Sequence, residues 1–140
     1  MVGFNMRVSK KTQYGLRAMV YLAKYSSKEK ICPLKEISQK EDIPFDFLEK
    51  IISELQTARL VKAKKGVQGG YFLTKHPKKI LAGEVVRALE STVPVSCAGC
   101  QIARICSAKN VWEKVQDSLD FALDSMTLAD LIKPKNVKKK

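Results

Sequence analysis

The 140-residue sequence predicts a mainly α-helical fold that carries one small β-hairpin. Three observations support this class. Apolar residues recur at steps of three and four along most of the chain, as in amphipathic helices. Two short runs of alternating or β-branched and aromatic residues flank a glycine-rich stretch at 66–70. Only 7 Gly and 5 Pro interrupt a chain that is 45% hydrophobic, and its length suits one compact unit with an extension.

Three helices are expected before the hairpin. The first spans about residues 10–26, with Ser9 or Thr12 as its N-cap. The second begins with Pro33 as its first helical residue and stops near residues 39–41. Pro44 blocks continuation and makes a turn, after which a third helix buries Phe47 or Leu48, Ile51, Ile52 and Leu55. Two short helices separated by this tight turn indicate a helix-turn-helix.

A hairpin is predicted to follow the third helix. Its strands lie near residues 60–64 and 71–74. Gly66, Gly69 and Gly70 between them permit a positive φ and a close approach of the backbone to another surface. Glycines of this kind serve any hairpin, but directly after a helix-turn-helix and beside lysines they favour a wing. The fold class is therefore a winged helix-turn-helix.

The C-terminal half is expected to hold a fourth helix from Leu81 to about Ser91, a loop at residues 96–107 and a long helix ending near Asp124. Thr127 and Asp130 have the spacing of a capping box for a last short helix. The long helix carries more apolar residues than one small core needs: Val111, Trp112, Val115, Leu119 and Ala122. We expect it to pair with a second copy as a dimerisation helix; the alternative is packing on its own domain.

Charge divides the chain into three predicted parts. Residues 1–80 carry 17 Lys and Arg against 7 Asp and Glu, residues 81–132 carry 4 against 7, and residues 133–140 carry 5 against none. We expect residues 1–80 to form the winged helix-turn-helix DNA-binding region. Residues 81–132 are expected to hold the cysteine loop and the dimerisation helix, and residues 133–140 to be a basic disordered tail. Such segregation of cations indicates a polyanionic partner such as double-stranded DNA, whereas the alternative is solubility alone. No apolar stretch is long enough for a membrane span or a signal peptide, so a cytoplasmic location is expected.

The third helix is predicted to enter the major groove with its N-terminal residues at the base edges. The side chains expected to be exposed there are Phe45, Asp46, Glu49 and Lys50. An acid can accept from cytosine and a lysine can donate to guanine or phosphate, although Asp46 has the alternative role of a helix cap. The further DNA contacts we expect are Lys10, Lys11, Lys35, Lys64, Lys65 and Gln68.

Three cysteines, Cys97, Cys100 and Cys106, fall within one loop with the spacing C-x2-C-x5-C. In a cytoplasmic chain such a cluster favours a metal or redox site over a disulfide framework. Zinc normally takes two close pairs, and neither a fourth nearby cysteine nor a usable histidine is present. Thiolates also hold iron–sulfur clusters. The alternative is three unligated thiols, and Cys32 is expected to be a small core residue.

An enzymatic function is not expected. The one histidine, His76, precedes a proline in a polar stretch and is predicted to lie on the surface. No carboxylate pair, nucleophile elbow or phosphate-binding loop accompanies it.

From about Met6 to Ile132 the chain resembles the Rrf2 family of bacterial regulators. The resemblance rests on MRVSKK (6–11), YGLRAM (14–19), LEK (48–50) with Leu55, KGVQGGY (65–71), GEVV (83–86) and the cysteine loop ahead of Trp112. It implies a homodimeric winged-helix repressor or activator, and the cysteines place it with the IscR- and NsrR-like branch. By that likeness Cys97, Cys100 and Cys106 hold an iron–sulfur cluster, 2Fe-2S or 4Fe-4S, and Lys65 replaces a wing arginine that enters the minor groove.

Two departures from the family pattern concern the ligand set. Many members space their cysteines evenly with five residues between them, whereas the first gap here is two. In one branch member a histidine completes the ligand set, and the matching residue in this chain is Lys109. In another member an acid from the partner subunit does so, and the matching residue here is Gln13. Gln13 is thus a possible fourth ligand, beside water, a small thiol or another acid. Alternatives are a cluster-free regulator of the same fold that responds to a metabolite, a partner protein or thiol oxidation, and a cluster carrier that regulates no genes.

Overall fold

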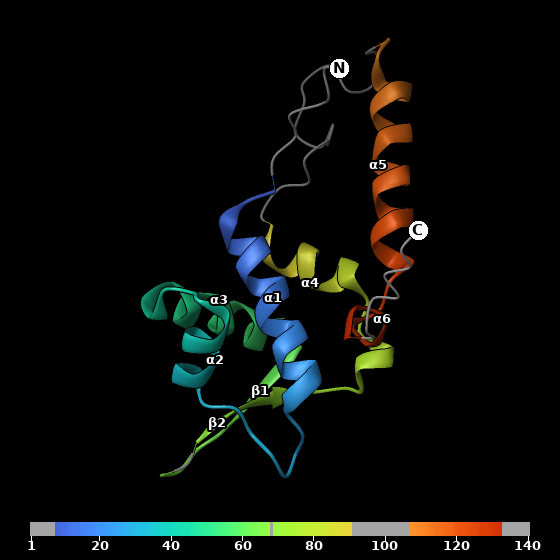
Figure 1. The fold of residues 1–140 in the computed structure, drawn as a ribbon. Coiled ribbons are helices and arrows are strands. Elements are labelled where there is room, and N and C mark those ends of the chain that lie inside the picture. Colours follow the sequence, from blue (N-terminus) through green and yellow to red (C-terminus); the bar gives the residue numbers. More distant parts are fainter. Residues whose placement is uncertain (1–7, 68, 91–106, 133–140) are drawn as a thin grey trace, which may run out of the picture.

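The computed structural model describes residues 8–67, 69–90 and 107–132. The helix α1 runs through the middle of the molecule, α2 and α3 pack on one side of it, the hairpin lies near its C-terminal end, and α5 stands apart (Figure 1). This arrangement confirms the predicted class. The elements are α1 (Lys10–Tyr25), α2 (Leu34–Glu41), α3 (Phe45–Thr57), β1 (Val61–Lys64), β2 (Gly70–Leu73), the 3-10 turn η1 (Pro77–Lys79), α4 (Ala82–Leu89), α5 (Lys109–Asp124) and α6 (Leu128–Ile132).

The helix α1 is the central element of the core. Ser9 is its N-cap, as one of the two sequence alternatives proposed, and its hydroxyl accepts a hydrogen bond from the Thr12 amide at 3.2 Å. One face of α1 is fully buried at Ala18, Met19 and Leu22. The buried side chains around it come from α2, α3, α4 and α6 and include Ile37, Leu48, Ile51, Leu55, Val85 and Leu128. Buried residues recur along α1 at steps of three and four, which explains why the sequence pattern predicts this helix.

The turn between α2 and α3 depends on Asp42, which takes the left-handed conformation with φ of 54°. The Ile43 amide then bonds the Ser38 carbonyl at 3.0 Å, and the Ile43 side chain is buried. Pro44 is the N-cap of α3. Pro33 is likewise the N-cap of α2, so the helix begins at Leu34, one position after the first helical residue that was predicted. Because the Pro33 carbonyl already accepts from Ile37, the shift is within the usual ambiguity of helix ends.

The wing contains a third segment beside the two strands of its hairpin. Strand β1 pairs antiparallel with β2 from Val61 opposite Leu73 to Lys64 opposite Gly70. On its other edge β2 bonds Cys32 through two hydrogen bonds with Tyr71, of 3.0 and 2.8 Å. Cys32 therefore provides a third, one-residue strand that ties the wing to the segment before α2. The thiol is buried, which confirms the prediction that Cys32 is a core residue.

The C-terminal elements return to the core through α6. Leu81 pairs with Thr127 in an isolated bridge, and the Leu128 side chain is fully buried. Thr127 and Asp130 form the predicted capping box, each backbone amide donating to the other's side chain at 3.0 and 3.2 Å. The 3-10 turn η1 was not predicted. His76 is exposed, as expected, and its Nδ1 accepts from the Lys78 amide at the start of that turn.

The helix α5 projects from the body and has no buried residue. Its apolar side chains are instead exposed at Val111 (56%) and Trp112 (44%), and Val115 and Leu119 are half-buried. Packing on its own domain, the alternative considered for this helix, thus leaves most of its apolar face open. In the part of the chain that the structure describes, no helix is long and apolar enough to cross a membrane.

Candidate nucleic-acid interface and cysteine site

The N-terminal turns of α3 present the four side chains that were predicted to face bases. Phe45 is 43% exposed, and Asp46, Glu49 and Lys50 are exposed as well. Opposite them, Leu48, Ile51 and Ile52 are buried and fix the helix on the core. Asp46 lies in the first turn, whereas the N-cap is Pro44 without a side-chain hydrogen bond. The carboxylate of Asp46 is therefore not the helix cap and stays exposed near the positive end of the helix dipole.

Residues of α1 support this end of α3. The ring of Tyr14 meets Phe47 edge-on with 5.5 Å between ring centroids. Lys10 and Arg17 lie over the Tyr14 ring at 5.6 and 5.5 Å from its centroid. Arg17 also donates to the carbonyl and carboxylate of Glu41 at the end of α2. Tyr14 and Arg17 were not among the predicted site residues, although their spacing from Lys10 places all three on one helix face.

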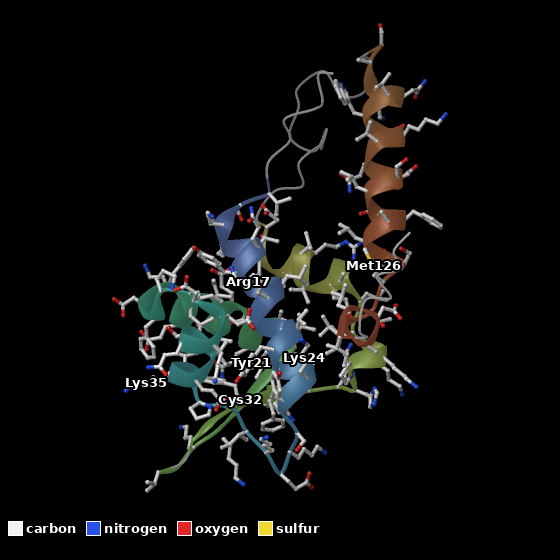
Figure 2. The ribbon with its side chains drawn as sticks, viewed as in Figure 1. Arg17, Tyr21, Lys24, Cys32, Lys35 and Met126 are labelled. Atoms are coloured by element: carbon white, nitrogen blue, oxygen red, sulfur yellow. The ribbon has the colours of Figure 1, made fainter. Side chains whose placement is uncertain are left out.

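The helix lysines that are predicted to contact phosphate differ in their exposure and in their contacts within the chain. Lys10 and Lys35 are exposed, and Figure 2 shows Lys35 at the outer edge of the helix-turn-helix. The ammonium of Lys11 is half-buried and donates to both carboxylate oxygens of Glu54 at 3.1 and 3.3 Å. This contact joins α1 to α3, so Lys11 holds the recognition helix in place.

The wing carries the remaining cations. Lys62, Lys64 and Lys65 are exposed, and Val67 at the tip is fully exposed. Gly66 takes φ of +132°, as expected for the hairpin turn. At Gly70 the absence of a side chain lets the strand lie close to another segment of this chain. A Cβ there would lie 2.6 Å from the Cys32 carbonyl. Gln68 lies outside the described residues.

The predicted cluster ligands Cys97, Cys100 and Cys106 also lie outside the described residues. Among residues 8–67, 69–90 and 107–132 no group of three or more Cys, His, Asp or Glu side chains is arranged to hold a metal ion. Gln13 is exposed, and its Nε2 donates to the Val8 carbonyl at 2.9 Å. It lines an open groove between α1, α4 and α5, together with Val8, Leu16, Val86 and Leu123 among others.

A carboxylate connects the start of α1 to the end of α4. Glu90, the C-cap of α4, accepts from the amide and the hydroxyl of Ser9 at 3.1 and 3.0 Å. A hydrogen bond from Thr12, with those from Ser9, lowers the pKa of Glu90 below the ordinary glutamate value. We call the two hydrogen bonds between Ser9 and Glu90 the Ser9–Glu90 tether. In the sequence, residues 91–106 follow directly after Glu90.

The geometry described above is that of a helix-turn-helix with a basic wing, and a family comparison agrees. A family model for Rrf2, described as an iron-dependent transcriptional regulator, matches residues 8–134. The chain belongs to the Rrf2 family. The resemblance inferred from the sequence motifs is thereby confirmed.

Individual relatives of this Rrf2 member are regulators as well. The HTH-type transcriptional regulator CymR of Bacillus subtilis is 36% identical over 126 residues, which cover 90% of this chain and 89% of CymR. The HTH-type transcriptional regulator IscR of Pectobacterium atrosepticum is 32% identical over 136 residues, which cover 94% and 82% of the two chains. The chain is thus a transcriptional regulator of the IscR and CymR type, and these relatives are not enzymes.

Solved structures share the fold. The structure of T. potens IscR has a TM-score of 0.79 and 35% identity, covering 97% of this chain and 94% of its own. The structure of CymR, the global cysteine regulator of B. subtilis, has a TM-score of 0.73 at 35% identity and covers 94% and 96%. The oxidized form of Staphylococcus aureus CymR has a TM-score of 0.75 at 29% identity and covers 94% and 100%. These likenesses confirm the winged-helix class.

Proposed function

We propose that this Rrf2-family regulator binds a double-stranded DNA operator as a homodimer and senses redox, iron–sulfur or nitric oxide status through an iron–sulfur cluster. The observation that carries the DNA-binding part is the exposed N-terminal end of α3 beside a basic wing. Sensing would lie in the cysteine loop, and the two parts meet where Glu90 bonds Ser9.

Reading of the operator is assigned to two adjacent surfaces. Phe45, Asp46, Glu49 and Lys50 would face base edges in the major groove, since they are exposed on the helix that follows the tight turn. Lys64 and Lys65 would lie along the backbone or in an adjacent minor groove. Lys10 and Lys35 would add phosphate contacts, whereas Lys11 is committed to Glu54.

Dimerisation is assigned to α5. Trp112, Val115, Leu119 and Ala122 are spaced by three and four residues, which is the pattern of a coiled-coil seam. A helix with exposed Val111 and Trp112 and no buried residue leaves an apolar stripe that a second copy would cover. Two recognition helices held by such a pair would read two half-sites of a palindromic operator.

The cluster would be held by the thiolates of Cys97, Cys100 and Cys106. Three thiolates are the soft donor set that iron–sulfur clusters take, and bound there the cluster would supply a redox-active iron centre. Gln13 is the fourth ligand we favour, because its Nε2 donates to the Val8 carbonyl and its amide oxygen is the atom that would bind iron. Glu90 would keep the start of α1, including Gln13, fixed relative to the segment that carries the cysteines.

The second candidate is a regulator of the same fold without a cluster, in which the cysteines act as thiol switches or a metabolite or partner protein is sensed. It is favoured by the similarity to CymR of B. subtilis, a global cysteine regulator, and to the oxidized form of Staphylococcus aureus CymR. In this candidate the change of state is oxidation of cysteine sulfur, which a cellular thiol reverses.

The deciding experiment is anaerobic purification followed by the visible absorbance spectrum and analysis of iron and sulfide. The cluster proposal expects coloured protein with both elements, and loss of both in Cys97→Ala, Cys100→Ala or Cys106→Ala. Cys32→Ala is the matched control, because that thiol is buried in the core and should leave the spectrum intact. Colourless protein that also fails chemical reconstitution would refute the cluster and leave the thiol switch.

DNA binding is tested separately by footprinting at several salt concentrations. A protected site of defined sequence supports regulation of transcription, with the cluster state changing the affinity. Weak, sequence-independent protection that disappears steeply with added salt would contradict operator binding and favour a cluster carrier instead.

A further inference from the structure

The orientation of α5 relative to the DNA-binding body depends on few contacts. Its C-terminal end is fixed through the residues that follow it, because Met126 bonds the Ala82 amide at 2.8 Å and Leu128 is fully buried. Figure 2 shows Met126 at the base of α5, beside the body. Along the helix itself no side chain is buried. Beside half-buried apolar side chains such as Leu119 and Leu123, polar contacts near its base hold α5 against α4.

Arg87 on α4 makes those contacts. Its Nη2 lies 2.9 and 2.8 Å from the two carboxylate oxygens of Asp124 and 3.3 Å from Asp120 Oδ1. Asp120 and Asp124 stand one turn apart on α5, so one guanidinium holds two successive turns of that helix. The Gln116 amide donates to the same Asp120 oxygen at 3.1 Å and orients it. We call Arg87, Asp120 and Asp124 the α4–α5 clamp.

Gly83 gives the clamp its space. A Cβ at this position would lie 2.2 Å from Asp124 Oδ1 and 2.8 Å from Arg87 Nη1. Gly83 lies inside α4, where alanine is the better helix former, so helix formation does not explain the glycine. The close contact with the Asp124 carboxylate does explain it. The space that the absent side chain leaves is occupied by the ends of the Asp124 and Arg87 side chains, so a Cβ at position 83 would disturb the clamp itself.

From this geometry we infer that Arg87 is a positioning residue that sets the spacing of the two operator half-sites. The inference rests on the proposed homodimer. If two copies join through α5, the tilt of α5 on its own body fixes the distance between the two recognition helices. A helix of 16 residues is roughly 24 Å long, so a tilt of about 10° moves its free end by about 4 Å. That shift compares with the rise of about 3.4 Å per base pair along DNA.

The test begins with selection of bound sequences by the full-length wild type from a random duplex DNA library. The selected palindrome is then rebuilt with one or two base pairs added to or removed from its centre, and affinities are measured. Wild type should prefer one spacing by at least tenfold. Arg87→Met and Gly83→Ala should each reduce that preference to threefold or less, or move the optimum by at least one base pair. Gly83→Ala keeps every charge and displaces the Asp124 carboxylate together with the Arg87 guanidinium.

Glu113→Gln is the matched control, since Glu113 pairs with Lys109 on α5 alone and should keep the wild-type spacing. Affinity for a duplex with a single half-site should stay within twofold in all variants, which excludes damage to the recognition helix. Unchanged spacing preference in dimeric Arg87→Met and Gly83→Ala would overturn the inference. A wild type that sediments as a monomer or selects no palindrome would instead refute the homodimer, and sedimentation of each variant separates the two failures.

Discussion

Glu90 and Ser9, 81 residues apart in the sequence, are joined by two hydrogen bonds of 3.1 and 3.0 Å to one carboxylate oxygen. The residue that caps α1 is thus held by the residue that closes α4. This relationship matters for the proposed sensing because residues 91–106, with the three candidate ligands, begin next to the first helix of the DNA-binding body.

Glu90→Gln is expected to lower the free energy of unfolding at pH 7 by about 0.5–1 kcal/mol, because a neutral amide oxygen accepts more weakly than a carboxylate. The hydrogen bonds from Thr12 and Ser9 lower the pKa of Glu90 in the folded protein. A depressed folded pKa stabilises the protein above the unfolded glutamate pKa, and this stability is lost as pH falls through the folded value. The difference between wild type and variant in urea unfolding should therefore shrink below about pH 4.3. A difference that stays constant from pH 7 down to about pH 3 would contradict the tether.

Two of the wing glycines, Gly66 and Gly70, should respond differently to alanine. At Gly70 the new Cβ would lie 2.6 Å from the Cys32 backbone, so Gly70→Ala should break the Cys32–Tyr71 pairing and cost about 2–3 kcal/mol. At Gly66 the space is open but φ is +132°, so Gly66→Ala should cost about 1 kcal/mol of backbone strain. Urea unfolding of both variants measures this order. Equal losses would mean that the third strand contributes little to the stability of the wing.

Periodicity predicted the elements whose burial repeats locally. The helix α1, whose buried residues recur at steps of three and four, could be predicted because nearby residues determine it. The turn at Ile43 and Pro44 could be predicted for the same reason. The Cys32–Tyr71 pairing and the Arg87 contacts with Asp120 and Asp124 were not, since each depends on two segments distant in sequence. Lys11 shows the same limit at the site. Its type favours a phosphate contact, which stays a prediction, whereas its ion pair with Glu54 at 3.1 Å joins two segments distant in sequence.

Cys32 is expected to be inert toward thiol reagents in the folded protein. Burial, the first cause, and the nearby Glu36 raise the pKa of its thiol to about 11, and the side chain is 1% exposed. The thiolate is the reactive form, so both effects slow alkylation. Figure 2 shows Cys32 between α1 and the hairpin. In a variant with Cys97, Cys100 and Cys106 changed to Ala, iodoacetamide labelling at pH 8 should be at least about 100-fold slower than in urea. Comparable rates in both conditions would show that Cys32 is an accessible thiol.

The proposed base and phosphate contacts predict two kinds of loss. Lys64→Gln and Lys65→Gln should weaken binding to all duplexes similarly and reduce the slope of log affinity against log salt by about one each. Glu49→Gln should instead cost about 1–3 kcal/mol on the selected operator and relax the preference at one base pair. Fluorescence anisotropy over a series of salt concentrations distinguishes the two. Lys114→Gln, on exposed α5, removes the same charge and should change neither quantity. A smaller effect of Lys64→Gln than of Lys114→Gln would exclude the wing from the interface.

The apolar face of α5 provides the last prediction. Leu119 lies within the row of Trp112, Val115 and Ala122, so Leu119→Glu would place a charge on the stripe proposed to face a second copy. Burying that carboxylate without a partner costs several kcal/mol, which is enough to shift a micromolar dimer to monomer. Asn110→Glu introduces the same charge on an exposed position of α5 away from this row, and it should leave the dimer intact. Sedimentation velocity measures both variants. Because no side chain of α5 is fully buried and its ion pairs with Arg87 are exposed, Leu119→Glu should keep a folded winged domain that still binds a single half-site. If Leu119→Glu sediments as a dimer like the wild type, the apolar stripe of α5 is not the dimer interface.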